Sequence, residues 1–177
     1  MATTGREEGN FPQFFTSTIL EWKQLLLNDS YKDIIIDSLR FLVRQQRVIV
    51  YGFVIMPNHV HIIWQIQPGH KREDVQRDFM KYTAQMMLRL MMKIDPAQVA
   101  DFHVNAVDRK YQFWERNALS IDLYNRKTLQ QKMQYIHNNP VQESWRLCTI
   151  PEEYKYSSAL YYEMGADNWG FITHYMD

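Results

Sequence analysis

Cysteine and long apolar stretches are both scarce in this chain. Among its 177 residues Cys148 is the lone cysteine, so no disulfide can form within the chain, and we expect a reducing compartment, the cytoplasm. We interpret Cys148 as a small, partly buried side chain rather than a catalytic thiol. No apolar run approaches the ~20 residues that a membrane-spanning helix needs. The first ten residues also lack the basic and apolar regions of a signal peptide, so we expect neither secretion nor membrane association.

An excess of basic charge is missing as well. The chain has 20 Lys and Arg and 20 Asp and Glu, which gives a net charge of zero. Proteins that bind nucleic acids usually have a basic excess or a basic patch, so any such surface here must be local. The hydrophobic content of 46% and the charged content of 23% are typical of a folded domain. We expect a flexible tail at residues 1–10 and a single domain over residues 11–177.

The spacing of apolar residues predicts seven regular elements. Alternating or wholly apolar stretches indicate strands, whereas apolar residues at i, i+4 and i+7 indicate helices. Pro57 separates the second strand from the third, because proline cannot continue a central strand. In chain order we expect a strand at 14–20, a helix at 31–45, strands at 47–55 and 59–67, a helix at 72–92, a strand at 118–123 and a helix at 127–139. We interpret 94–110 as a connecting loop, and the end of the chain as irregular with one more helical turn.

The order of these elements predicts the fold class. Strand, helix, strand, strand, helix, strand is the order of the split β-α-β, or ferredoxin-like, plan with an antiparallel sheet. The seventh element is a helix that would cover the remaining face of the sheet. We therefore predict an α+β fold. Along the helix at 72–92 we expect one buried stripe, formed by Val75, Phe79, Tyr82, Met86 and Leu90.

Two histidines stand two residues apart in the third predicted strand. Because side chains alternate along a strand, His59 and His61 lie on the same face and can reach one divalent ion. Taken alone, a pair of half-exposed histidines on a polar face would also explain this pattern, since so short a motif recurs by chance. The common zinc patterns HExxH and CxxC are absent, and no carboxylate cluster lies nearby in the sequence.

The last predicted helix carries a second group of polar residues. Tyr135 precedes Asn139 by four residues, so both project from neighbouring turns of one helix face. Tyr135 is about 100° around the helix from the apolar Ile136, which puts it at the edge of the buried stripe, where its hydroxyl could reach the histidines. An amphipathic tyrosine with a packed ring and a solvated hydroxyl would also fit this position.

Four segments of the sequence, taken in order, resemble one known family. They are FVIMPNHVHIIW (53–64), FWER (113–116), YIHNNPV (135–141) and YSSA (156–159). The chain resembles the HUH single-tyrosine transposases, and most closely the REP-associated tyrosine transposases and the transposases of related insertion sequences. The likeness runs from the first strand to Ser158. Four segments in this order are far more specific than any one of them.

The resemblance implies a fold, a reaction and a set of site residues. The fold would be that of the HUH endonucleases, with the tyrosine-bearing helix added to the ferredoxin-like plan. His59, His61 and, by position, Asn139 would hold a divalent metal, Mg²⁺ or Mn²⁺. Tyr135 would cleave single-stranded or hairpin DNA through a covalent 5′-phosphotyrosine that allows rejoining. His137 remains an alternative third ligand, although its i+2 offset from the tyrosine directs it elsewhere on the helix.

Tyr124 is the next candidate for the nucleophile. Basic residues at the start of the helix predicted at 72–92, along it and after it are predicted to contact DNA phosphates. Taken singly, each of them would also fit an ordinary solvated, charged surface. The set is Lys71, Arg72, Arg77, Lys81, Lys110 and Arg116.

Two other functions stay open: a relative that binds repeat hairpins without cutting them, and a metallohydrolase whose histidines activate water. Relatives of this kind include monomers and swapped dimers, so a homodimer is open too.

Overall fold

One four-stranded antiparallel sheet organises the structure, a computed structural model that describes residues 10–177. In spatial order the strands are β2 (Val48–Ile55), β3 (His59–Ile66), β1 (Gln13–Thr18) and β4 (Leu119–Asp122). Each neighbouring pair is antiparallel. The flexible tail predicted at residues 1–10 lies, apart from Asn10, outside the described residues.

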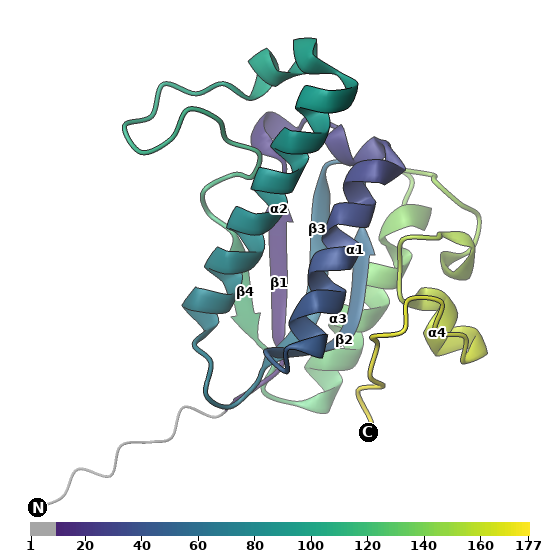
Figure 1. Cartoon of the computed structure of the whole chain (residues 1–177). Coiled ribbons are helices and arrows are strands. Elements are labelled where there is room, and N and C mark those ends of the chain that lie inside the picture. Colours follow the sequence, from purple (N-terminus) through teal and green to yellow (C-terminus); the bar gives the residue numbers. More distant parts are fainter. Residues whose placement is uncertain (1–9) are drawn as a thin grey trace, which may run out of the picture.

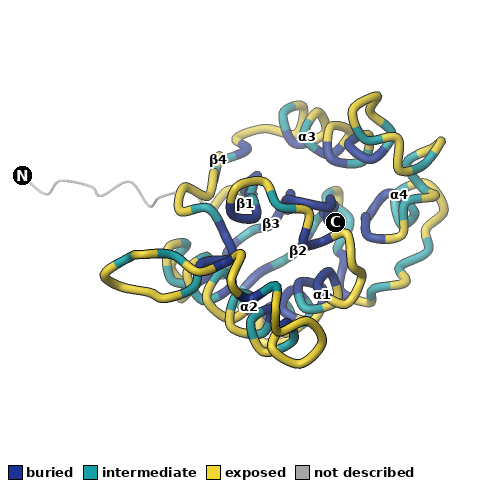
Figure 2. Tube along the Cα trace, turned by 90° about the horizontal axis from the view of Figure 1, so that it is seen from above, coloured by how far each residue is buried: buried dark blue, intermediate teal, exposed yellow. Residues whose placement is uncertain are grey.

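Helices cover both faces of this sheet (Figure 1). Helices α1 (Asp29–Arg44) and α2 (Arg72–Ile94) pack together on one face, and α3 (Arg126–Asn138) lies on the opposite face, as Figure 2 shows from above. The short α4 (Ala159–Met164) follows near the C-terminus. The α+β class, the ferredoxin-like order and the added tyrosine-bearing helix are thus confirmed. No helix within residues 10–177 is long and apolar enough to cross a membrane.

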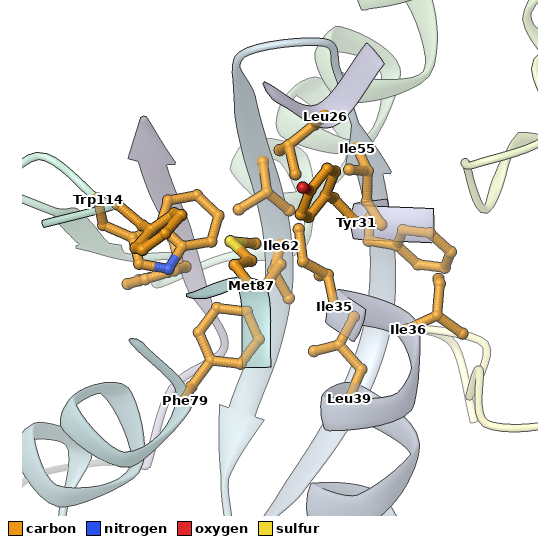
Figure 3. Close-up of a cluster of buried hydrophobic side chains, with 14 of the residues drawn as sticks. Leu26, Tyr31, Ile35, Ile36, Leu39, Ile55, Ile62, Phe79, Met87 and Trp114 are labelled. Atoms are coloured by element: carbon orange, nitrogen blue, oxygen red, sulfur yellow. The ribbon is translucent and has the colours of Figure 1, made fainter. Parts of the chain in front are cut away.

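The larger core lies between the sheet and the layer formed by α1 and α2 (Figure 3). Ile35 and Leu39 of α1, Phe79 and Met87 of α2, and Ile62 of β3 belong to this core. Each of these side chains is at most 1% exposed. Full burial of one large apolar side chain contributes roughly 1.5–3 kcal/mol, so this layer supplies much of the packing energy. A smaller core, which includes Phe14, Ile63 and Met133, lies on the α3 side of the sheet.

The chain departs from the sequence prediction at two connections. Strand β1 ends at Thr18 rather than at residue 20, because the chain turns there into the 3-10 helix Leu20–Trp22. The segment 94–110, predicted as a loop, contains the 3-10 helix Pro96–Phe102. Both are short 3-10 pieces, which carry too few apolar residues to show a period in the sequence.

The buried stripe of α2 is displaced from the predicted one. It runs through Val75, Phe79, Thr83, Met87 and Met91. Tyr82, which we expected to be buried, is 48% exposed. Thr83 can occupy a core position because its hydroxyl donates to the Phe79 carbonyl oxygen at 2.8 Å and accepts from Trp114 Nε1 at 2.9 Å. A polar residue with satisfied hydrogen bonds thus replaces the expected aromatic side chain in the core.

Candidate active site

Two histidines of β3 face helix α3. In the register of the sheet, His59 lies opposite Thr18 and His61 lies opposite Thr16 of β1. Their imidazole ring centroids are 4.7 Å apart. The two residues are 9% and 6% exposed, so the face that they share is covered rather than open to solvent. The shared face agrees with the alternation of the sequence, and its burial follows from α3 packing over it.

Hydrogen bonds at Nδ1 set the orientation of both imidazole rings. Asn58 Oδ1 lies 2.7 Å from His59 Nδ1, and Thr16 Oγ1 lies 2.7 Å from His61 Nδ1. With these oxygens accepting from Nδ1–H, each ring keeps a lone pair on Nε2. Outer partners of this kind hold the tautomer and the direction of metal-binding histidines. Both Nε2 atoms are therefore available as ligands.

Burial favours the neutral form of both imidazoles. It lowers the pKa of His59 to about 4, with the side chain of Asn139 acting in the opposite direction. It lowers the pKa of His61 to about 3, and the charges of His59 and Lys132 act in the same direction. Since neutral imidazole is the form that binds a metal ion, the site can take up a cation at neutral pH without first releasing protons from these rings.

We expect the metal-free protein to lose stability as the pH falls from about 7 to about 5. An unfolded histidine titrates near pH 6.5, whereas His59 and His61 titrate at about 4 and about 3 in the folded chain. Between these values the unfolded chain binds more protons. The contribution of the two histidines to the free energy of unfolding is therefore complete at a pH above their unfolded pKa. At lower pH this contribution decreases, by up to about 1.4 kcal/mol per pH unit for each histidine. Urea titrations in chelator measure this slope.

The double variant His59→Ala/His61→Ala is the control for this slope. Without the two imidazoles, the dependence of the unfolding free energy on pH should become shallower over that range, and His137, whose pKa burial lowers to about 4, should account for part of the slope that remains. Equal slopes in the two proteins would contradict the expectation that both imidazoles are neutral in the folded state.

Helix α3 approaches the sheet closely at a glycine. Its buried residues are the three predicted to point inward, Leu129, Met133 and Ile136. A Cβ atom at Gly52 of β2 would lie 2.4 Å from Met133 Sδ and 3.0 Å from Ser158 Oγ. A side chain at Gly52 would require the side chains of Met133 and Ser158 to shift, so this glycine leaves room for the Met133 side chain against β2.

Tyr135 lies beside the histidines on the edge of the buried stripe of α3. Its ring centroid is 5.5 Å from that of His61 and 6.1 Å from that of Phe14. Phe14 in turn stacks on His61 with 5.2 Å between the centroids. These contacts hold the tyrosine ring in place. The residue is nevertheless 44% exposed, so a reactant can approach it from solvent.

Asn139, the C-cap residue of α3, offers a candidate third ligand atom beside His59. The residue is 3% exposed, and its Oδ1 is buried without a hydrogen-bond partner among residues 10–177. A buried, unpaired acceptor costs roughly 1–3 kcal/mol, which fits an oxygen that a bound cation would satisfy. Its side chain interacts with His59. Two imidazole nitrogens and one amide oxygen suit a divalent cation. Within residues 10–177, no group of three His, Cys, Asp or Glu residues offers another metal site.

His137 has a different set of contacts. Its Nε2 lies 2.7 Å from Ser158 Oγ, and its ring centroid lies 5.4 Å from that of Tyr162. Ser158 Oγ also accepts from the backbone N–H of Phe53 at 3.0 Å. Burial lowers the pKa of His137 to about 4. This histidine therefore links α3 to the segment before α4, and the geometry favours Asn139 as the third ligand.

Three residues beside the site were not anticipated from the sequence. Phe14 lies on the same face of β1 as Thr16 and contacts His61. Lys132 Nζ lies 5.6 Å from the centre of the Tyr135 ring. Trp145, in the irregular segment after α3, has its ring 5.9 Å from that of His59. Strand alternation could have indicated Phe14, and helix periodicity could have indicated Lys132. Nothing in the local sequence indicated Trp145.

The basic residues predicted to contact DNA do not join this site. They lie on α2 or at its start, or in the segment at 110–116. Helix α2 is on the side of the sheet opposite α3 (Figure 2), and Phe113 and Trp114 belong to the core on that side. Arg77, Lys81 and Arg116 line a cleft of about 930 Å³. Some are already paired: Arg72 with Asp122, Arg77 with Asp74, and Arg116 with Asp108. A role for the six in binding DNA stays a prediction.

Comparison with known proteins bears on the fold. The sequence matches no family model and no curated protein. Among solved structures, the chain is similar to a REP-associated tyrosine transposase bound to a REP hairpin, with a TM-score of 0.65 and 16% identity, over 100% of this chain and 94% of that one. A candidate transposase from Deinococcus radiodurans R1 has a TM-score of 0.48 and 18% identity, over 77% of this chain and 97% of that one. The first likeness shows a shared fold, and the second is too low to add to it.

Proposed function

We propose that this chain is a metal-dependent, single-tyrosine endonuclease and transposase that cleaves and rejoins single-stranded or hairpin DNA. One observation carries the proposal: an accessible tyrosine, two neutral histidines and a buried amide oxygen that has no hydrogen-bond partner among residues 10–177 lie together beside one face of one sheet. All of them belong to the same chain, so one copy has every group of the site, whether or not it forms a homodimer. The fold shared with a REP-associated tyrosine transposase supports the proposal.

His59, His61 and Asn139 would hold the divalent cation, Mg²⁺ or Mn²⁺. Their donor atoms are softer as a set than the all-oxygen sites typical of Mg²⁺, and Mn²⁺ is expected to bind such nitrogen-containing sites more tightly. When bound, the cation supplies Lewis-acid chemistry by polarising a phosphate oxygen. Asn58 and Thr16 would keep the two imidazoles directed at it through their contacts with Nδ1.

Tyr135 would supply the nucleophile. Its hydroxyl oxygen forms a bond to phosphorus while the bond from phosphorus to the 3′ oxygen breaks. The phenol proton is lost to solvent, and the leaving 3′ oxygen takes up a proton from solvent. The products are a 5′-phosphotyrosine and a free 3′ hydroxyl, and attack by a 3′ hydroxyl on the phosphotyrosine rejoins DNA without a nucleotide cofactor. The ring contacts with His61 and Phe14 would hold the tyrosine through both steps.

The substrate in this proposal is DNA with an unpaired segment. The nucleophile must reach an exposed backbone, and unpaired bases can stack on aromatic side chains. Trp145, which is partly exposed and lies 5.9 Å from the His59 ring, offers such a surface beside the metal ligands. The REP-associated tyrosine transposase of similar fold was solved with a REP hairpin. Since the net charge of the chain is zero, recognition of unpaired bases would matter more here than overall attraction to phosphates.

We expect the purified protein to form a covalent adduct with a hairpin oligonucleotide that carries a single-stranded flank, in the presence of Mn²⁺. A fully paired duplex of the same sequence should give little adduct, because its backbone and bases are less accessible. The oligonucleotide is labelled at its 3′ end, so the fragment attached through its 5′ phosphate carries the label on a denaturing gel. Hairpin binding should weaken as the salt concentration rises.

The outcomes of this experiment separate three functions. A labelled adduct supports the single-tyrosine enzyme. Hairpin binding with neither adduct nor cleavage would indicate a hairpin-binding protein that does not cut. Metal-dependent cleavage that gives only free products would indicate a metallohydrolase with a histidine-bound, activated water. Equal reaction with a perfect duplex, independent of salt, would contradict the proposed substrate.

A further inference from the structure

Lys132 brings a positive charge to the tyrosine. It precedes Tyr135 by three residues on α3, so both side chains project from neighbouring turns of one helix face. Its Nζ lies 5.6 Å from the centre of the Tyr135 ring and 4.7 Å from the centre of the Phe14 ring. The same charge contributes to the lowered pKa of His61. The ammonium group therefore lies near the rings of both Phe14 and Tyr135.

No acidic side chain within residues 10–177 neutralises this ammonium group. The ion pairs of that part of the chain join other lysines and arginines, and none includes Lys132. The other polar side chains of the site, the Asn139 amide and the His59 and His61 imidazoles, carry no negative charge. Among residues 10–177, Lys132 thus has no ion-pair partner and brings a positive charge to the side of Tyr135.

Phe14 holds the charge in position without cancelling it. An ammonium group over an aromatic ring is attracted by the face of the ring and keeps its full charge. Phe14 is buried, stacks on His61 and touches the edge of Tyr135. Its ring therefore joins Lys132, Tyr135 and His61 in one packed group, in which the lysine is available to an anion that approaches from solvent.

From this geometry we propose that Lys132 is a catalytic residue that binds a nonbridging oxygen of the phosphate attacked by Tyr135. The proposal rests on the proposed function, because it requires a phosphodiester at the tyrosine. A lysine ammonium is a compact charge that binds phosphate oxygens. It would stabilise the negative charge on the phosphate as the bond to Tyr135 forms and the bond to the 3′ oxygen breaks. Lys132 keeps its proton throughout and forms no covalent bond.

The test compares Lys132→Met and Lys132→Arg with Lys127→Met, which removes an exposed lysine of the same helix. The assay is the rate of adduct formation in a single turnover, at saturating hairpin DNA and Mn²⁺. We expect Lys132→Met to slow this rate by about 10²-fold, the cost of losing one positioned donor at a developing oxyanion. Lys132→Arg should keep a larger share of the rate, because its charge remains. Lys127→Met should match the wild-type protein.

Two further measurements identify the phosphate as the group that Lys132 binds. Mn²⁺ affinity, followed by electron paramagnetic resonance, should not weaken in Lys132→Met, because the substitution removes a positive charge near the cation. With a methylphosphonate at the scissile position, the difference in rate between Lys132→Met and the wild type should shrink, since the charged oxygen that couples to the lysine is gone.

Equal rates of adduct formation in Lys132→Met and the wild type would overturn this proposal and leave the chemistry of Tyr135 intact. Loss of both Mn²⁺ binding and cleavage in the Met and Arg variants would assign Lys132 a structural role instead. Absence of any adduct with the wild-type protein would overturn the proposed function itself, and the role of Lys132 with it.

Discussion

The Tyr135→Phe variant is expected to form no covalent adduct and to leave hairpin DNA uncut. The substitution removes only the hydroxyl oxygen, which is the nucleophile of the reaction. The ring keeps its contacts with His61 and Phe14, and the residue is half-exposed, so the free energy of unfolding should change by no more than about 0.5 kcal/mol. Fluorescence anisotropy with the hairpin should give the wild-type affinity, which separates loss of chemistry from loss of binding.

Tyr124→Phe is the matched control for this variant. Tyr124 is 68% exposed and packs against Phe11, with 5.0 Å between the ring centroids. We expect the control to cleave and to form adduct at the wild-type rate. An adduct that persists in Tyr135→Phe and disappears in Tyr124→Phe would move the nucleophile to the second tyrosine.

Removing either histidine of β3 should abolish metal-dependent cleavage. His59→Ala and His61→Ala each delete one of three protein donors. A change to an outer partner of a metal ligand already costs 10–100-fold, so loss of a direct ligand should exceed about 10²-fold in both Mn²⁺ affinity and cleavage rate. Hairpin affinity should change little, because it depends on phosphate and base contacts. Isothermal titration with Mn²⁺ and the denaturing-gel assay measure the two losses.

Two residues at the C-terminal end of α3, His137 and the C-cap residue Asn139, provide the controls for the metal site. Asn139→Ala should weaken Mn²⁺ binding as the histidine variants do, because it removes the buried Oδ1. His137→Ala should bind Mn²⁺ normally, although loss of its hydrogen bond with Ser158 should lower the free energy of unfolding by about 1 kcal/mol. Undiminished cleavage in chelator, or cleavage by the double histidine variant, is incompatible with a metal-dependent reaction.

The sheet and the pairing of the histidines were predictable because strand alternation is local and strict. A period of two along residues 59–67 requires His59 and His61 to share a face, and the structure has them on one face. The order of elements then determined the antiparallel ferredoxin-like arrangement. The same local reasoning directed Leu129 and Met133 of α3 inward, and they are buried.

The buried stripe of α2 was misread because hydrophobicity alone ranks Tyr82 above Thr83 as a core residue. Thr83 is buried since its hydroxyl has partners at Phe79 and Trp114. Trp114 lies 31 residues away in the sequence, and no local pattern reports such a contact. A polar residue becomes a core residue when a distant segment satisfies its hydrogen bonds.

The geometry of the site depends on contacts of the same long-range kind. Phe14 meets His61 only because β1 pairs with β3, and Lys132 meets Phe14 only because α3 lies across that face. Helix spacing alone gave the positions of Tyr135 and Asn139 relative to each other. It could not give the burial of Asn139 Oδ1, which depends on how closely the whole helix approaches the sheet.

The attachment site of the DNA tests the central claim most directly. Adduct trapped with hairpin DNA and Mn²⁺ is treated with nuclease and trypsin, and the peptides are sequenced by tandem mass spectrometry. The tryptic peptide 133–146 contains Tyr135 as its single tyrosine. We predict a nucleotide linked through its 5′ phosphate to that residue. A nucleotide on peptide 117–126, which carries Tyr124, or no linked peptide from a reaction that cleaves DNA, would contradict the assignment of Tyr135 as the nucleophile.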